Sequence, residues 1–151
     1  MTLETKNSIG NFFEDFSINQ KIEHATPRTI THGDASVYTS LYGTRFALHS
    51  SNEFAKNLKL KGSPIDDFLL FNIAFGKTVP DISLNALANL GYADCKFLAP
   101  VYPGDTIKSI SHVIGLKENS NGETGVVYVN SISTNQKNDV VLDFKRWVMI
   151  K

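Results

Sequence analysis

The sequence predicts an α+β domain in which a curled antiparallel sheet wraps around a long central apolar helix. Two observations lead to this prediction. Residues 30–79 carry helix signals, whereas the residues after Leu84 carry mostly strand and turn signals. Segment 65–79, IDDFLLFNIAFGKTV, is apolar on nearly every side, and a helix of that kind is enclosed by other structure rather than laid on a surface. We expect the later strands to supply that enclosure.

Capping-box patterns, in which a polar residue is followed three positions later by an acidic one, mark the helix starts. They occur at residues 31–34, 50–53 and 63–66. The first helix is expected to stop at Gly43, since glycine tolerates the left-handed backbone that ends many helices. The third pattern predicts the start of the central helix, with Pro64 at its first position.

Four segments with apolar alternation or β-branched residues follow the central helix, and short turns separate them. They are residues 88–101, 106–118, 126–135 and 140–151. An earlier segment, residues 20–31, is a further candidate for extended structure. Consecutive strands joined by short turns favour an antiparallel sheet. One helix followed by such a sheet is the hotdog architecture, and we expect residues 1–151 to form a single hotdog domain.

The composition excludes several classes of function. Fifteen basic and fifteen acidic residues cancel, so there is no electrostatic footprint for nucleic acid or an anionic membrane. The one cysteine, Cys95, rules out an internal disulfide, and we expect it to be a small core residue. His24, His32 and His112 lack metal-ligand spacing, so no metal site is expected. A polar N-terminus and short apolar runs predict a cytoplasmic protein without a membrane segment.

Residues 96–107, KFLAPVYPGDTI, closely resemble the strand-turn-strand signature of the MaoC-like dehydratases. Segments 11–22 and 28–43 and the central helix fall in the order of that family, so the resemblance covers essentially the whole chain. It is closer to one subgroup, the mesaconyl-coenzyme A hydratases, whose chains carry two hotdog repeats in tandem. The present chain resembles their N-terminal half and stops where the first repeat would end.

The resemblance implies a candidate catalytic segment at residues 43–49. Members of the family carry a pattern close to Gly-Asp-x-Asn-Pro-Leu-His, whose Asp and His hold and deprotonate a water molecule. Here Gly43, Leu48 and His49 match, but Thr44 stands at the aspartate position. Threonine hydrogen-bonds water but does not act as a base near neutral pH. His49 would therefore be the base and Thr44 a water-positioning group; the alternative is a histidine packed at a turn.

Three further residues are candidates for substrate binding. Arg45 would pair with a carboxylate of a dicarboxylic acyl group, although a surface ion pair with Glu53 explains it equally well. Ile65 and Asp66 stand at the start of the central helix, where the family uses a backbone N–H to polarise the thioester carbonyl. Pro64 beside them has no N–H.

The sequence leaves three functions open. The first is an enoyl-coenzyme A hydratase or dehydratase acting on a short, branched or dicarboxylic acyl thioester such as mesaconyl-coenzyme A. The second is a catalytically degenerate hotdog module that binds acyl-coenzyme A or completes a dimer with a catalytic partner, and the third is a hotdog thioesterase. No cofactor is expected beyond the coenzyme A of the substrate. The expected partner is a second copy or another hotdog chain, because a single hotdog leaves one sheet edge unpaired.

Overall fold

The structure is a computed structural model that describes residues 9–43, 45–120 and 122–151. The elements follow one another as η1 (Phe13–Asp15), β1 (Lys21–Glu23), β2 (Arg28–Thr29), α1 (His32–Tyr42), η2 (Ala47–His49), α2 (Asn52–Asn57), α3 (Asp67–Thr78), η3 (Val79–Ser83), β3 (Ala86–Phe97), β4 (Thr106–Glu118), β5 (Gly125–Thr134) and β6 (Val140–Ile150). The strands pair antiparallel in the order β1-β4-β5-β6-β3, and β2 also pairs with β4. Among these residues, no helix is long and apolar enough to cross a membrane. The predicted α+β class is confirmed.

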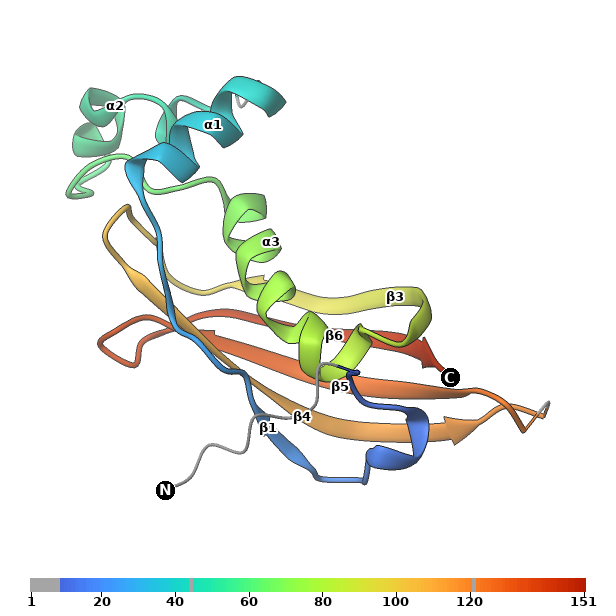
Figure 1. The fold of residues 1–151 in the computed structure, drawn as a ribbon. Coiled ribbons are helices and arrows are strands. Elements are labelled where there is room, and N and C mark those ends of the chain that lie inside the picture. Colours follow the sequence, from blue (N-terminus) through green and yellow to red (C-terminus); the bar gives the residue numbers. More distant parts are fainter. Residues whose placement is uncertain (1–8, 44, 121) are drawn as a thin grey trace.

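Helix α3 lies along one face of the sheet, while α1 and α2 extend beyond the end of the sheet (Figure 1). The α3 side chains Leu69, Leu70, Ile73 and Ala74 are buried in an apolar cluster with side chains of β4 and β6. Burial of each large apolar side chain stabilises the fold by about 1.5–3 kcal/mol. The sheet curls around the helix because β3 pairs with β6 through register shifts, and such bulges bend a strand and increase its twist.

A band of polar side chains crosses the inner face of the sheet between two apolar clusters. Along β4, Ser109 and Ser111 separate Ile107 of the first cluster from Val113 of the second. We call this set the inner polar band, and it consists of His24, Ser109, Ser111, Ser131, Ser133 and Arg146. Its members bond to one another or to neighbouring polar groups, for example Ser109 Oγ to Ser133 Oγ at 2.8 Å. The central layer of this hotdog is therefore only partly apolar.

The helix ends test the capping predictions. In α1, the Thr31 side chain accepts from the Asp34 N–H and Gly43 adopts φ 60°, so both predicted ends are confirmed. Helix α2 begins one residue later than predicted, because Ser51 and not Ser50 accepts from the N–H of Phe54.

The start of the central helix was wrongly predicted. Asp66 is its N-cap and accepts from the Phe68 N–H, so the regular turns begin at Asp67. Residues 63–66 do not form a capping box, since the Ser63 hydroxyl has no hydrogen-bond partner among the described residues. The Ile65 N–H donates to the carbonyl of Val101 at 2.8 Å. This contact with the segment after β3 holds the chain extended up to Asp66.

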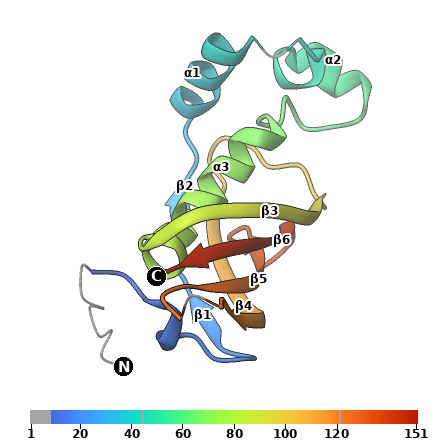
Figure 2. The same cartoon turned by 90° about the vertical axis from the view of Figure 1, so that its right-hand side faces the viewer.

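The enclosure of α3 is also less complete than predicted. Phe68 on its outer side is 64% exposed and packs edge-on against Phe97 of β3. Strand β3 lies at the edge of the sheet beside α3 (Figure 2). Further exposed apolar side chains lie on or just after β3, and with Phe68 we call them the β3 edge surface: Leu87, Leu90, Tyr92 and Leu98. Cys95 on the same strand is exposed, which corrects its expected place in the core.

Candidate active site

A pocket of about 380 Å³ lies at the N-terminal end of α3, where η2 faces the segment that follows β3. Its walls come from residues far apart in the sequence: Phe46, Leu48, His49, Leu60, Pro64, Asp67, Phe97, Leu98, Ala99 and Pro100. Only His49 and Asp67 among these ten have titratable side chains. A largely apolar cleft with a few convergent polar groups is the usual form of a small-molecule site.

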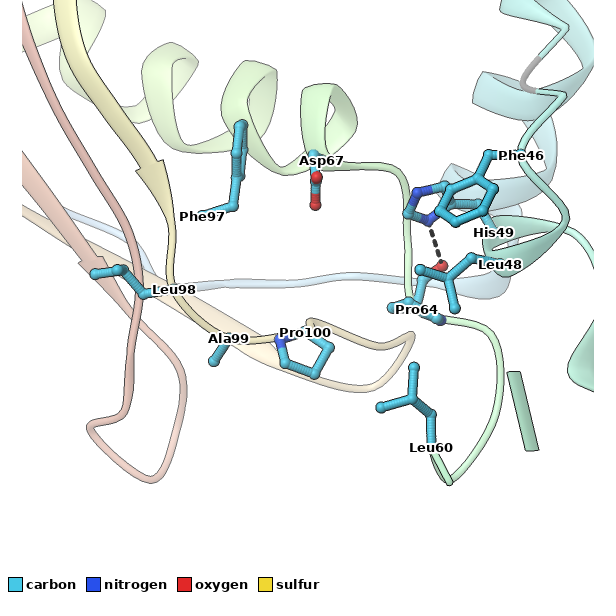
Figure 3. A pocket seen from close by; sticks show the side chains of 10 residues that line it. All are labelled: Phe46, Leu48, His49, Leu60, Pro64, Asp67, Phe97, Leu98, Ala99 and Pro100. Carbon is cyan, nitrogen blue, oxygen red and sulfur yellow. Dashed lines mark hydrogen bonds between the residues drawn. The ribbon is translucent and has the colours of Figure 1, made fainter. Parts of the chain in front are cut away.

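His49 ends the short helix η2 and is fixed by a hydrogen bond. Its Nδ1 lies 3.2 Å from the carbonyl oxygen of Pro64, as the dashed line in Figure 3 marks. A carbonyl only accepts, so Nδ1 donates, and in the neutral ring Nε2 carries the lone pair. The Phe46 ring packs edge-on against the imidazole at a centroid distance of 5.7 Å. The geometry therefore holds one tautomer, with Nε2 available to accept a proton.

Asp67 is a pocket residue that sequence reasoning did not single out as functional. As the first residue of α3, it places its carboxyl on the wall of the pocket that His49 also lines (Figure 3). Desolvation raises the pKa of the Asp67 carboxyl, and the negative charge of Asp66 adds to this, while His49 acts in the opposite direction. The only sequence signal was a pair of consecutive acidic residues in a first helical turn, which equally fits the helix dipole.

The predicted substrate-binding residues do not line this pocket. Arg45 is exposed, and no ion pair joins it to Glu53, although both residues are described. Ile65 is only 3% exposed, with its side chain in the apolar core. Asp66 caps α3. Thr44 lies outside the described residues. Of the four predicted site residues that the structure describes, His49 alone lines the pocket.

Asp105 holds the turn between β3 and β4. Its two carboxylate oxygens accept from the Tyr102 N–H and from the side-chain amide of Gln136, each at 2.8 Å. Asp105 therefore organises the turn that contains Pro103 and Gly104. Within residues 9–43, 45–120 and 122–151, no group of three or more His, Cys, Asp or Glu side chains is arranged to hold a metal ion.

Comparison with known proteins places these features in a family. A family model described as "MaoC like domain" matches residues 14–136. The chain is 61% identical over 149 residues to a β-methylmalyl-CoA dehydratase of Chloroflexus aurantiacus, covering 99% of this chain and 42% of that protein. It is 52% identical over 146 residues to a mesaconyl-CoA hydratase of Cereibacter sphaeroides, covering 97% of this chain and 43% of that protein. The chain thus spans less than half the length of both relatives.

A solved structure supports the fold. A conserved protein of Mycobacterium tuberculosis with a double hotdog fold superposes with a TM-score of 0.86 at 27% identity, covering 93% of this chain and 44% of that one. The curled sheet, the central helix, the pocket at its N-terminal end and the matched family model agree with one another. The chain therefore belongs to the MaoC-like domain family and has the hotdog fold.

Proposed function

We propose that this protein is a hydro-lyase that adds water to, or removes water from, the coenzyme A thioester of a short, branched or dicarboxylic enoic acid. One observation carries the proposal: His49, the base that the family resemblance implies, lines a largely apolar pocket with its Nδ1 engaged by Pro64. Identities of 61% to the β-methylmalyl-CoA dehydratase and 52% to the mesaconyl-CoA hydratase support it.

In the hydration direction, His49 Nε2 accepts a proton from water while the water oxygen attacks C3 of the enoyl group. The electrons of the double bond move to the thioester oxygen, where an N–H donor stabilises the enolate. The Ile65 N–H already donates to Val101. We therefore assign the donor to the N–H of Asp67, because the first residue of a helix has no N–H acceptor within the helix.

The remaining sequence candidates have supporting roles in this proposal. Thr44 positions the attacking water, and Arg45 pairs with the second carboxylate of a dicarboxylic acyl group. Ile65 and Asp66 act through the backbone: Ile65 ties the chain to Val101, and Asp66 caps the turn that carries the N–H donor. The reaction needs no cofactor beyond the coenzyme A of the substrate.

A partner completes the proposed site. The pocket includes Phe97 and Leu98, which lie at the end of β3, and β3 is an edge strand whose side chains leave much apolar surface exposed. Pairing of a second hotdog along β3 would cover this surface and close the side of the acyl pocket. We propose a homodimer.

One observation favours a second candidate. The chain carries Thr44 where the family pattern has aspartate. In this alternative, it is a non-catalytic hotdog that completes the acyl pocket of a separate catalytic chain.

The test is an assay of the purified protein with crotonyl- and mesaconyl-coenzyme A, following loss of the enoyl-thioester absorbance. We expect turnover by the native protein and a decrease of about 10²–10⁴-fold in kcat for His49→Ala, the range that general base catalysis supplies. Faster turnover of mesaconyl- than of crotonyl-coenzyme A would support a dicarboxylic substrate. Absence of turnover with both thioesters contradicts the enzyme and favours the second candidate.

A further inference from the structure

The pocket contains a second group capable of proton transfer, and it comes from a different element than His49. His49 ends η2, whereas Asp67 begins α3, 18 residues later in the chain. Both side chains face the same space, with the rings and methyl groups of apolar residues around them (Figure 3). The sequence has Thr44 where the family pattern has aspartate, whereas Asp67 provides the pocket with a carboxyl group from another part of the fold.

We propose that Asp67 is the acid partner of His49, donating the proton that reaches the α-carbon of the substrate. This inference rests on the proposed hydratase function and goes further, because it names the second proton-transfer group. Addition of water across a double bond needs a base for the water and an acid for the carbon. Among the side chains that line the pocket, Asp67 is the one that can supply the acid.

The step balances with these two groups. His49 removes one proton from water, the oxygen forms a bond to C3, and the π electrons of the C2–C3 bond become those of the enolate. The enolate collapses as C2 takes the proton of the Asp67 carboxyl, which leaves a carboxylate and a thioester. The proton on His49 then passes to Asp67 through a water molecule, which restores both groups. Dehydration is the same sequence in reverse.

The surroundings of Asp67 favour the acid role. Desolvation and the Asp66 carboxylate both raise the pKa of Asp67, so its carboxyl keeps a proton to higher pH than an exposed aspartate does. His49, from η2, opposes this effect. From β3, Cys95 also faces this carboxyl: burial raises the pKa of its thiol, and the charge of Asp67 raises it further. A carboxyl in such surroundings suits proton donation.

The test compares Asp67→Asn and Asp67→Glu with a control, Asp15→Asn. Asp15 is exposed in η1, outside the pocket lining, and its contact with the Phe12 N–H can be kept by an amide oxygen. We expect Asp67→Asn to lower kcat at least about 100-fold with KM changed less than about threefold, because a lost general acid affects the chemical step. Asp67→Glu should recover part of the rate, and Asp15→Asn should match the native enzyme.

A pH profile gives a readout that a structural role would not change. In the native enzyme kcat/KM should decrease as pH rises and Asp67 loses its proton, and in Asp67→Asn this decrease should disappear. Calorimetric titration with crotonyl-coenzyme A should show equal binding by both proteins. If Asp67→Asn turns over substrate at the native rate and still loses kcat/KM at high pH, Asp67 is not the acid, and the proposed hydratase function is unaffected. Lack of turnover by the native protein overturns the proposed function, and the acid role with it.

Discussion

At the scale of single residues, His24 of the inner polar band has a hydrogen-bond partner at each ring nitrogen. Its Nδ1 lies 2.8 Å from Asp81 Oδ2 and its Nε2 lies 2.8 Å from Ser111 Oγ. An ionised Asp81 only accepts, so Nδ1 donates to it and Nε2 accepts from Ser111. This Asp-His-Ser order is that of a hydrolase triad, but Ser111 is 0% exposed. The group therefore joins η3 to the sheet rather than acting on a substrate.

This network predicts a loss of stability in acid. Burial lowers the pKa of His24, and the contacts with Asp81 partly oppose this effect. The positive charges of Arg146 and Lys77 lower the His24 pKa further. A histidine with a depressed pKa leaves the folded protein binding fewer protons than the unfolded chain below about pH 6.5, so stability falls as pH falls. We expect the Tm to decrease more between pH 7.5 and 5.5 in the native protein than in His24→Gln.

Differential scanning fluorimetry at matched ionic strength measures the slope of Tm against pH for the native protein and for His24→Gln. The exposed His32 supplies the control, since His32→Gln should keep the native slope. Equal slopes for the native protein and His24→Gln would show that other groups set the acid sensitivity.

At the scale of elements, the position of α3 depends on its cap. The Asp66 carboxylate accepts from the Phe68 N–H at 2.9 Å, and this turn places Asp67 in the pocket. Loss of an N-cap costs about 1 kcal/mol, whereas asparagine retains the acceptor. We expect Asp66→Ala to lower the free energy of unfolding by that amount and Asp66→Asn to stay near the native value. Urea denaturation provides the comparison, and equal losses for both variants would mean that the charge matters rather than the cap.

The same helix shows how far the sequence determines the elements. The ends of α1 were predictable because Thr31, Asp34 and Gly43 act on their own neighbours through local hydrogen bonds and backbone conformation. The start of α3 was not, because Ile65 is held by Val101, 36 residues later, and no local pattern records that contact. Capping preferences compete with tertiary contacts, and here the tertiary contact prevails.

The candidate site likewise has one residue that the sequence reveals and one that it does not. His49 was recognisable because it stands in a seven-residue pattern with Gly43. Asp67 was not, since Asp66 and Asp67 are equivalent in the sequence and only the packing of α3 against the segment after β3 turns one of them toward the pocket. The pocket walls come from four separate segments of the chain, and their meeting is a property of the fold.

At the scale of the whole molecule, the β3 edge surface exposes apolar side chains along an edge strand of the sheet. Among the described strands, β3 pairs with β6 alone, so its other side is available to a further strand. Phe68 is 64% exposed, Leu90 53% and Leu98 54%, all beside this edge. Natural sheets protect such an edge with charge, bulges or a partner. A second copy that pairs along β3 would bury both the backbone groups and the apolar side chains.

We therefore expect the native protein to sediment as a dimer at micromolar concentration and Leu90→Lys to weaken the dimer at least about tenfold, a difference of about 1.4 kcal/mol. A lysine buried in an interface along β3 loses its hydration, which opposes association. The matched control is Ile114→Lys on β4, where a side chain 41% exposed lies away from the β3 edge, and this variant should remain dimeric. A native monomer, or a dissociation constant that Leu90→Lys leaves unchanged, would exclude β3 as the interface.

Because Phe97 and Leu98 at the end of β3 line the pocket, weakening of the dimer should also raise KM for the acyl thioester.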